Sequence, residues 1–407
     1  MAGRSAARYR EVFAVGEFRA LWLAHIASIA GDQLARVAVS VLVFDRTHSP
    51  ALAAATYAVT FLPDLLGGTL LAGLADRYSR RLVMVTADLV RAGVVAMLAL
   101  PGLPLVVQIG ALFVVQLLAG PFTAARNAVL PEMLSGDRYT VAATVVAGTY
   151  QLALVLGFGA GAAVVTVIGA QTALVVDAAT FALSAIVITT GLSAHRPPAA
   201  RPARRAVWWS SLRSGIAAIA DHREARVLLA IACLCGFYVV PEGLAVAYSA
   251  QIGAGIDGLG WLLVANPVGT VIGVLILNRW NPDTKLRWLG PLAVASSALL
   301  VPTAAAPGLA VTVGLWALSG MATAHDAVTN AAFTTAVPNE VRGQAVGLAM
   351  ACLRAAQGVG IALAGLLAQL MPTSWVIGIA GGLGTVVGLA VAVAWAQVLA
   401  RRAPDPA

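Results

Sequence analysis

Several ionisable side chains interrupt stretches of the sequence that are otherwise strongly apolar. Those that could do chemistry there are Asp32, Arg36, Asp64, Glu242, Asp326 and Arg354. An ionisable group among apolar residues is costly to keep, so such groups usually serve a function, most often the binding of protons, ions or a polar substrate. We therefore predict that these residues bind a substrate, or that they bind protons whose movement is coupled to that of a substrate.

Asp64 has the most informative spacing of the set. It lies twelve residues before Asp76, which is about 18 Å along a helix that rises about 1.5 Å per residue. If Asp76 ends a membrane helix, Asp64 lies near the middle of the bilayer. Two interpretations remain open: a site that binds a proton or cation, or an acid that is hydrogen-bonded to a neighbouring helix.

The other candidates suggest ion pairs. Asp32 and Arg36 are four residues apart and share one helical face, so they either neutralise each other or line a cavity and exchange partners. Arg354 requires an acidic partner, for which Asp326 and Glu242 are the candidates. Asp177 is predicted to serve packing, and the neighbour of Asp326, His325, is predicted to be a polar packing residue.

The elements that position these residues must be membrane helices. Hydrophobic residues make up 60% of the chain and charged residues 11%, and the mean hydropathy is +0.87. In soluble domains about 45–50% of the residues are apolar and about 25% are charged. Residues 105–119 and 376–396 contain no Asp, Glu, Lys or Arg, and they show no strand-like alternation. We therefore predict an all-α integral membrane protein without a removable signal peptide.

Twelve spans are expected, as two six-helix repeats around a central cavity. They are residues 18–44, 51–75, 82–100, 105–128, 140–165, 169–191, 226–250, 257–278, 287–305, 308–332, 343–370 and 374–399. Residues 1–191 form the first half, 192–225 a Pro- and Arg-rich cytoplasmic linker, and 226–407 the second half. Gly157 and Gly161, in a glycine-rich span with a counterpart in the second half, are predicted to allow close helix packing.

The net charge of +8 does not indicate nucleic-acid binding. Arginines gather in every second loop, and the other loops contain only Arg46. This distribution places the basic loops, and both termini, on the cytoplasmic side of the cell membrane, next to anionic lipid head groups. Cys233, Cys235 and Cys352 lack the spacing of a zinc site, so neither a metal nor a cofactor is expected.

The loop between the second and third spans carries a family resemblance. It reads Gly73-Leu-Ala-Asp76-Arg77-Tyr-Ser79-Arg80-Arg81. It resembles the signature Gly-x-x-x-Asp-Arg-x-Gly-Arg-Arg/Lys of the major facilitator superfamily, with Ser79 in place of the second glycine and the first glycine one position nearer the acid. The resemblance implies that Asp76 meets the positive end of another helix and closes the cytoplasmic side. We expect Gly73, Arg77, Arg80, Arg81, Asp88 and Arg91 to belong to this cytoplasmic gate.

Further motifs resemble the drug-export branch that includes macrolide-efflux and enterobactin-type exporters. They are Ser28-x-x-Gly31-Asp32, Thr47-His-Ser49-Pro50-Ala51, Asp88-Leu-Val-Arg91-Ala, Arg126-Asn-Ala-Val-Leu-Pro131-Glu132 and Asp177-Ala-Ala-Thr-Phe181. The chain departs from this branch in three places. The fifth span lacks a Gly-Pro pair, the fourth lacks an arginine at its middle, and the second half has only Asn278-Arg279-Trp280 where the Asp-Arg loop would repeat.

These features predict a monomeric secondary transporter that exports small amphiphilic or hydrophobic molecules in exchange for protons. Protonation of one or more of Asp32, Asp64, Glu242 and Asp326 would accompany substrate release. An importer, a lipid or siderophore transporter and a non-transporting sensor remain alternatives. An enzyme is not expected, because the sequence contains no His-Glu-x-x-His and no Gly-x-Ser-x-Gly motif.

Overall fold

The computed structural model describes residues 9–67, 71, 74, 77–194 and 205–402. Within these residues the regular secondary structure is helical, as the composition predicts. Eight segments of the described chain are long and apolar enough to cross a membrane. They are Gly16–Thr47, Leu105–Met133, Ala170–Gly191, Arg223–Gln251, Gly255–Leu277, Pro282–Ala305, Arg342–Leu367 and Thr373–Arg401.

Four of the twelve expected spans are not among these eight. Their described parts are nevertheless helical, as α3 (Pro50–Ala58) with α4 (Phe61–Leu66), α6 (Arg80–Leu98), α8 (Asp137–Ile168), and α16 (Leu309–Thr323) with α17 (His325–Ala336). Helix α6 carries four charged residues, which are two arginines at its start and Asp88 and Arg91 within it. The total of twelve spans stays a prediction.

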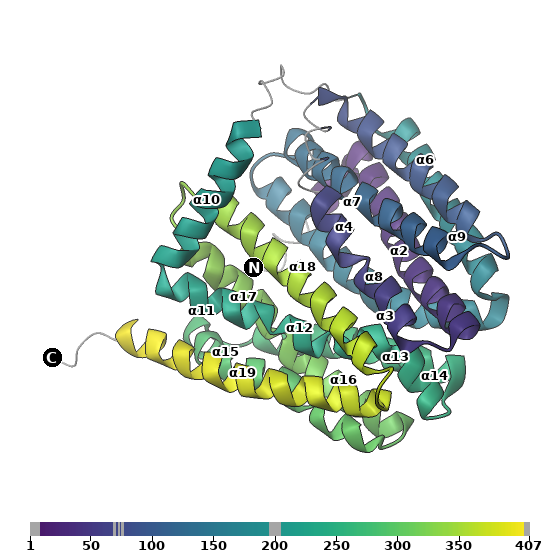
Figure 1. Ribbon diagram of the computed structural model, residues 1–407. Coiled ribbons are helices and arrows are strands. Elements are labelled where there is room, and N and C mark those ends of the chain that lie inside the picture. Colours follow the sequence, from purple (N-terminus) through teal and green to yellow (C-terminus); the bar gives the residue numbers. More distant parts are fainter. Residues whose placement is uncertain (1–8, 68–70, 72–73, 75–76, 195–204, 403–407) are drawn as a thin grey trace. The chain divides into compact units, whose positions relative to one another are not determined.

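The chain divides into two compact units. Unit 1 comprises residues 1–46 and 59–203, and unit 2 comprises residues 47–58 and 204–407. Unit 1 contains most of α2 (Gly16–Thr47), and α4, α6, α7 (Leu105–Met133), α8 and α9 (Ala170–Gly191). The helices of unit 1 are purple to blue in Figure 1, where α6 and α9 run side by side.

One end of unit 1 is organised by a buried apolar cluster. Phe18 and Leu21 of α2, Met84 of α6, Phe122 of α7 and Ile188 of α9 are among its members. Helix α6 begins after Ser79, whose hydroxyl accepts a hydrogen bond from the Leu82 backbone N–H at 3.4 Å. A serine at this position satisfies one of the free N–H groups at the start of a helix.

Unit 2 contains α3 together with all helices after residue 204. These are α10 (Arg205–Asp221), α11 (Arg223–Cys233), α12 (Cys235–Tyr238), α13 (Val240–Gln251), α14 (Gly255–Leu277), α15 (Pro282–Ala298), the 3₁₀ helix η2 (Val301–Ala305), α16, α17, α18 (Arg342–Leu367) and α19 (Thr373–Arg402). Helix α3 belongs here because it packs against α13 and α18, where Gly365 of α18 lies directly on Ala54. The division into sequence halves at residues 192–225 stays a prediction.

Glycines set the close contact between α14 and α16. A Cβ atom at Gly269 would collide with the Ala317 carbonyl oxygen, and one at Gly320 would collide with the Asn266 carbonyl oxygen. The two helices therefore approach to backbone contact, which is the usual role of small residues between membrane helices.

Two expected spans of unit 2 are interrupted near acidic residues. The seventh is divided into α11, α12 and α13, and Glu242 lies in the first turn of α13 beside Pro241. The tenth is divided at Ala324, and Asp326 lies in the first turn of α17. Each acid thus sits at the positive end of a helix segment, where a carboxylate is favoured.

Candidate functional site

The guanidinium of Arg91 is the centre of a buried polar cluster in unit 1. Its Nη2 donates to Asp32 Oδ1 at 2.5 Å, and its Nη1 donates to Ser28 Oγ at 3.0 Å and to Asp88 Oδ1 at 3.4 Å. The guanidinium also lies 4.0 Å from the centre of the Phe181 ring. Only 1% of the Arg91 side chain is exposed, so its charge is neutralised by these neighbours rather than by water.

Two acids of this cluster are fully enclosed. Asp88 accepts a hydrogen bond from the Ser184 hydroxyl through Oδ2 at 2.5 Å. Asp177 accepts one from Thr180 through Oδ1 at 3.3 Å. Two carboxylates, Asp32 and Asp88, therefore bind one guanidinium, and Asp177 lies on the neighbouring face of α9. Such an arrangement can exchange protons and ion-pair partners.

Helical spacing explains how three helices supply the cluster. Asp88 and Arg91 are three residues apart on α6, and Ser28 and Asp32 are four apart on α2, so each pair shares a face. Asp177, Phe181 and Ser184 follow the i, i+4, i+7 pattern of one face of α9. Gly31 allows α2 to reach this face, because a Cβ atom there would collide with Asp177 Oδ1 and the Thr180 hydroxyl.

The expected pair between Asp32 and Arg36 is not formed. Asp32 is bound by Arg91 instead, from a helix 59 residues away in the sequence. The Nε atom of Arg36 is buried and has no hydrogen-bond partner within the described part of the chain. Gly157 and Gly161 of α8 lie against the same part of α2. A Cβ atom at Gly157 would be 2.7 Å from Gln33 Cβ.

The acids of unit 2 are bound to tyrosines. Tyr238 donates to Asp326 Oδ2 at 2.7 Å, and Tyr57 of α3 donates to Glu242 Oε2 at 2.9 Å. His325 is completely buried with Nδ1 at 3.4 Å from Asp326 Oδ1, whereas 41% of the Asp326 side chain is exposed. Arg354 donates to Gln357 Oε1 at 3.4 Å, and its pairing with an acid stays a prediction.

Part of the predicted cytoplasmic gate is described. Arg80 is buried, forms an ion pair with Glu132 of α7, and donates to the Ala128 carbonyl oxygen at 3.0 Å. Arg77 is exposed and Arg81 is half-buried. Gly73 and Asp76 lie outside the described residues. The same holds for the side chain of Asp64, whose backbone is part of α4.

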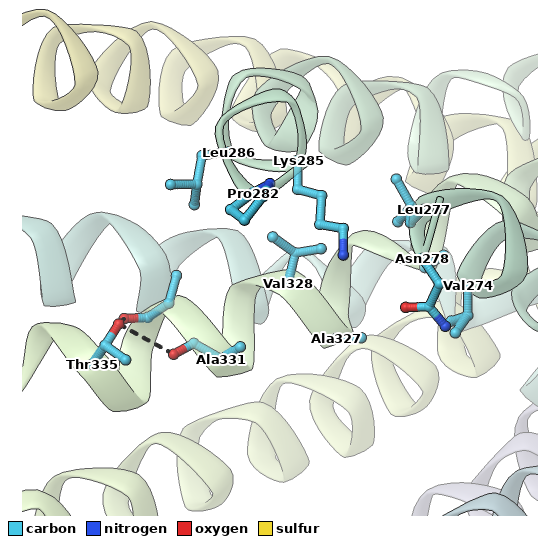
Figure 2. Close-up of a pocket in the computed structure, with 12 residues that line it drawn as sticks. Val274, Leu277, Asn278, Pro282, Lys285, Leu286, Ala327, Val328, Ala331 and Thr335 are labelled. Carbon is cyan, nitrogen blue, oxygen red and sulfur yellow. Dashed lines mark hydrogen bonds between the residues drawn. The ribbon is translucent and has the colours of Figure 1, made fainter. Parts of the chain in front are cut away.

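A separate cavity of about 400 Å³ lies between α14, α15 and α17. Figure 2 shows the Lys285 side chain extending from α15 toward α17, between Val328 and Asn278. Lys285 is the only lysine in the sequence, and the rest of the lining is mostly aliphatic. Among the described coupling acids, Asp32, Glu242 and Asp326 are not lining residues of this cavity.

The sequence profile of the Major Facilitator Superfamily matches residues 21–246, more than half of the chain. The chain belongs to the Major Facilitator Superfamily. It is therefore a multi-pass membrane transporter rather than an enzyme, and the predicted membership of the major facilitator superfamily is confirmed.

Curated superfamily relatives are distant in sequence. The chain is 28% identical to the multidrug efflux pump Tap of Mycolicibacterium fortuitum over 87% of this chain and 90% of that protein. It is 27% identical to Tap of Mycobacterium tuberculosis (strain ATCC 25618 / H37Rv) over 84% of each chain. The MFS-type transporter YkuC of Bacillus subtilis is 26% identical over 67% of each chain.

Solved superfamily structures share the fold. A POT family transporter in complex with 5-aminolevulinic acid has a TM-score of 0.76 at 11% identity, covering 94% of this chain and 96% of that one. A variant of the nucleoside transporter NupG has a TM-score of 0.68 at 15% identity, covering 94% of this chain and 99% of that one. At these identities the likeness shows the superfamily fold alone.

Proposed function

We propose that the protein is a proton-coupled antiporter that exports small amphiphilic or hydrophobic molecules across the cell membrane by alternating access. It belongs, on this proposal, to the drug-export branch and has twelve spans with both termini in the cytoplasm. The observation that carries the proposal is the Asp32–Arg91–Asp88 cluster, because buried acids around one shared cation provide a place for coupling protons. The Tap relatives, which are multidrug efflux pumps, support export.

The cluster suggests how coupling works in unit 1. Arg91 joins α6 to α2 through Asp32, and protonation of Asp32 would remove the charge that holds the guanidinium there. The contact between α2 and α6 then weakens, which favours rearrangement of the helices. One elementary charge moving through 100 mV supplies about 2.3 kcal/mol, comparable with the loss of such a contact.

The acids of unit 2 are proposed to bind substrate or a second proton. Asp326 and Glu242 each accept a tyrosine hydroxyl in the first turn of a helix segment, and Asp326 is partly exposed. A hydrogen-bonded carboxylate on a partly exposed side chain suits a cationic or polar group on an otherwise apolar substrate. Asp64 and Arg354 remain in the proposed coupling and binding group on the basis of the sequence.

The test is dye transport in proteoliposomes with an imposed pH gradient. We expect the wild type to move ethidium against its gradient only when protons flow the other way. Asp32→Asn should abolish this uphill transport, while Asp283→Asn, which removes an exposed acid on α15, should leave it unchanged. Uphill transport by Asp32→Asn at the wild-type rate, or transport that ignores the proton gradient in the wild type, would exclude the proposal.

A further inference from the structure

Asp177 on α9 is completely buried, and one of its oxygens has no hydrogen-bond partner. The Thr180 hydroxyl donates to the Asp177 backbone carbonyl oxygen at 2.8 Å and lies 3.3 Å from Oδ1, whereas Oδ2 receives no hydrogen bond from any residue in the described part of the chain. The side chain is aimed at α2, where it lies against Gly31, next in sequence to Asp32. Packing alone does not account for a carboxyl group in this position.

The charges around Asp177 come from the helices that pack against α9. Helix α6 supplies Arg91, with Asp88 three residues before it, helix α2 supplies Asp32, next to Gly31, and the charged residues of α8 are confined to its first turn. Asp177 interacts electrostatically with Asp32 and with Arg91. The Nη1 and Nη2 atoms of Arg91 already donate to Ser28, Asp32 and Asp88, whereas its buried Nε atom has no hydrogen-bond partner within the described residues.

A buried carboxylate with one weak hydrogen bond, and with no ion pair to a cationic side chain of the described residues, is unstable in its ionised form. The cost of enclosing such a charge is large, and the group is neutralised by a proton instead. Resting on the proposed proton coupling, we propose that Asp177 is a proton-binding site that is protonated in this conformation and that shares Arg91 with Asp32. As a neutral acid, Asp177 leaves the guanidinium free to bind Asp32.

Loss of the proton would change the partner of Arg91. The O–H bond of Asp177 breaks, its electron pair stays on the oxygen, and the proton passes to water. The new carboxylate then competes with Asp32 for the guanidinium, which moves from α2 toward α9. Asp32, whose side chain is 16% exposed, takes up the proton that replaces its lost cation. The total charge of the cluster is the same before and after the exchange.

Infrared difference spectroscopy of the purified protein tests the site without any substrate. Protonated carboxyl groups have a carbonyl absorption that is separate from the amide and carboxylate bands. We expect this absorption at neutral pH in the wild type, its loss in Asp177→Asn, and its retention in Asp283→Asn, which alters an exposed acid on α15. An unchanged absorption in Asp177→Asn would show that Asp177 is ionised and would overturn the proposal.

A second variant keeps the test decisive if Asp177→Asn does not fold. Asp177→Glu retains the acid but moves its carbonyl absorption, so a shifted band supports the assignment and an unshifted band contradicts it. Transport is measured in parallel. A band assigned to Asp177 in a protein that ignores the proton gradient would refute antiport while leaving the proton site intact, so the two failures are distinguishable.

Discussion

Arg91 Nη2 donates to Asp32 Oδ1 at 2.5 Å, which ties α6 to α2 inside unit 1. The sequence predicts separate roles for the two residues: coupling for Asp32, which lies in an apolar span, and the cytoplasmic gate for Arg91, which follows the signature loop. Their contact brings both residues into one buried cluster. On the proposed mechanism, a coupling event at Asp32 is thereby transmitted to α6, the helix that begins with Arg80 and Arg81 of the predicted gate.

Arg91→Ala should strongly destabilise the protein. Removal of one partner of a buried ion pair leaves the other charge uncompensated and costs about 3–5 kcal/mol. We expect a large fall in the apparent Tm in detergent, whereas Arg279→Ala, which removes an exposed arginine after α14, should have little effect. Equal Tm values for the two variants would show that Arg91 is not required to neutralise the cluster.

Ser184→Ala tests the hydrogen bond to Asp88. The hydroxyl is the donor at 2.5 Å from Asp88 Oδ2, and both side chains are fully buried. Leaving this oxygen without a donor should cost about 1–3 kcal/mol of stability. Thr189→Ala, on the same helix, removes a hydroxyl that donates to the Ala185 carbonyl oxygen of its own helix, and it serves as the control in thermal unfolding. A Ser184→Ala protein as stable as this control would contradict the assignment.

Gly31→Ala should impair proton coupling by a steric effect, because it changes no charge. The added methyl group collides with Asp177 Oδ1 and the Thr180 hydroxyl, so the Asp177 carboxyl group must move from its position. We expect reduced stability and a loss of gradient-driven dye transport. Gly93→Ala is the matched control, because a Cβ atom at Gly93 meets nothing within 4 Å. Wild-type transport in Gly31→Ala would mean that the close approach is not needed.

Tyr57 and Glu242 should be energetically coupled. Their hydrogen bond of 2.9 Å joins α3 to α13 within unit 2. A double-mutant cycle of Tyr57→Phe and Glu242→Gln, read by thermal unfolding, should give a coupling of about 1 kcal/mol or more, as expected for a hydrogen bond to a charged group. Additive effects of the two substitutions would indicate that the contact contributes nothing to stability.

Much of the fold follows from the sequence because membrane helices are dictated by local composition. The apolar runs, such as residues 105–119, identify long helices without any knowledge of their neighbours. The break at Ala324 could not be predicted, since neither Pro nor Gly marks it. The placement of α3 with unit 2 depends on its contacts with α18, which no local pattern encodes.

The site follows less completely from the sequence because ion-pair partners lie on different helices. Arg36 is the nearest cation to Asp32 in the sequence, but Arg91 binds it in the structure. Sequence reasoning predicts only a packing role for Asp177, although its i, i+4, i+7 relation to Phe181 and Ser184 places it on the face of α9 that meets Arg91. That pattern is the signal that sequence reasoning missed.

Proton counterflow tests the central claim most directly. Proteoliposomes containing a pH-sensitive dye are given an ethidium gradient and no imposed pH gradient. Antiport predicts that ethidium moving in one direction drives protons in the other, and that Asp32→Asn abolishes this proton movement. Ethidium transport by the wild-type protein with no accompanying change in internal pH would contradict proton-coupled antiport.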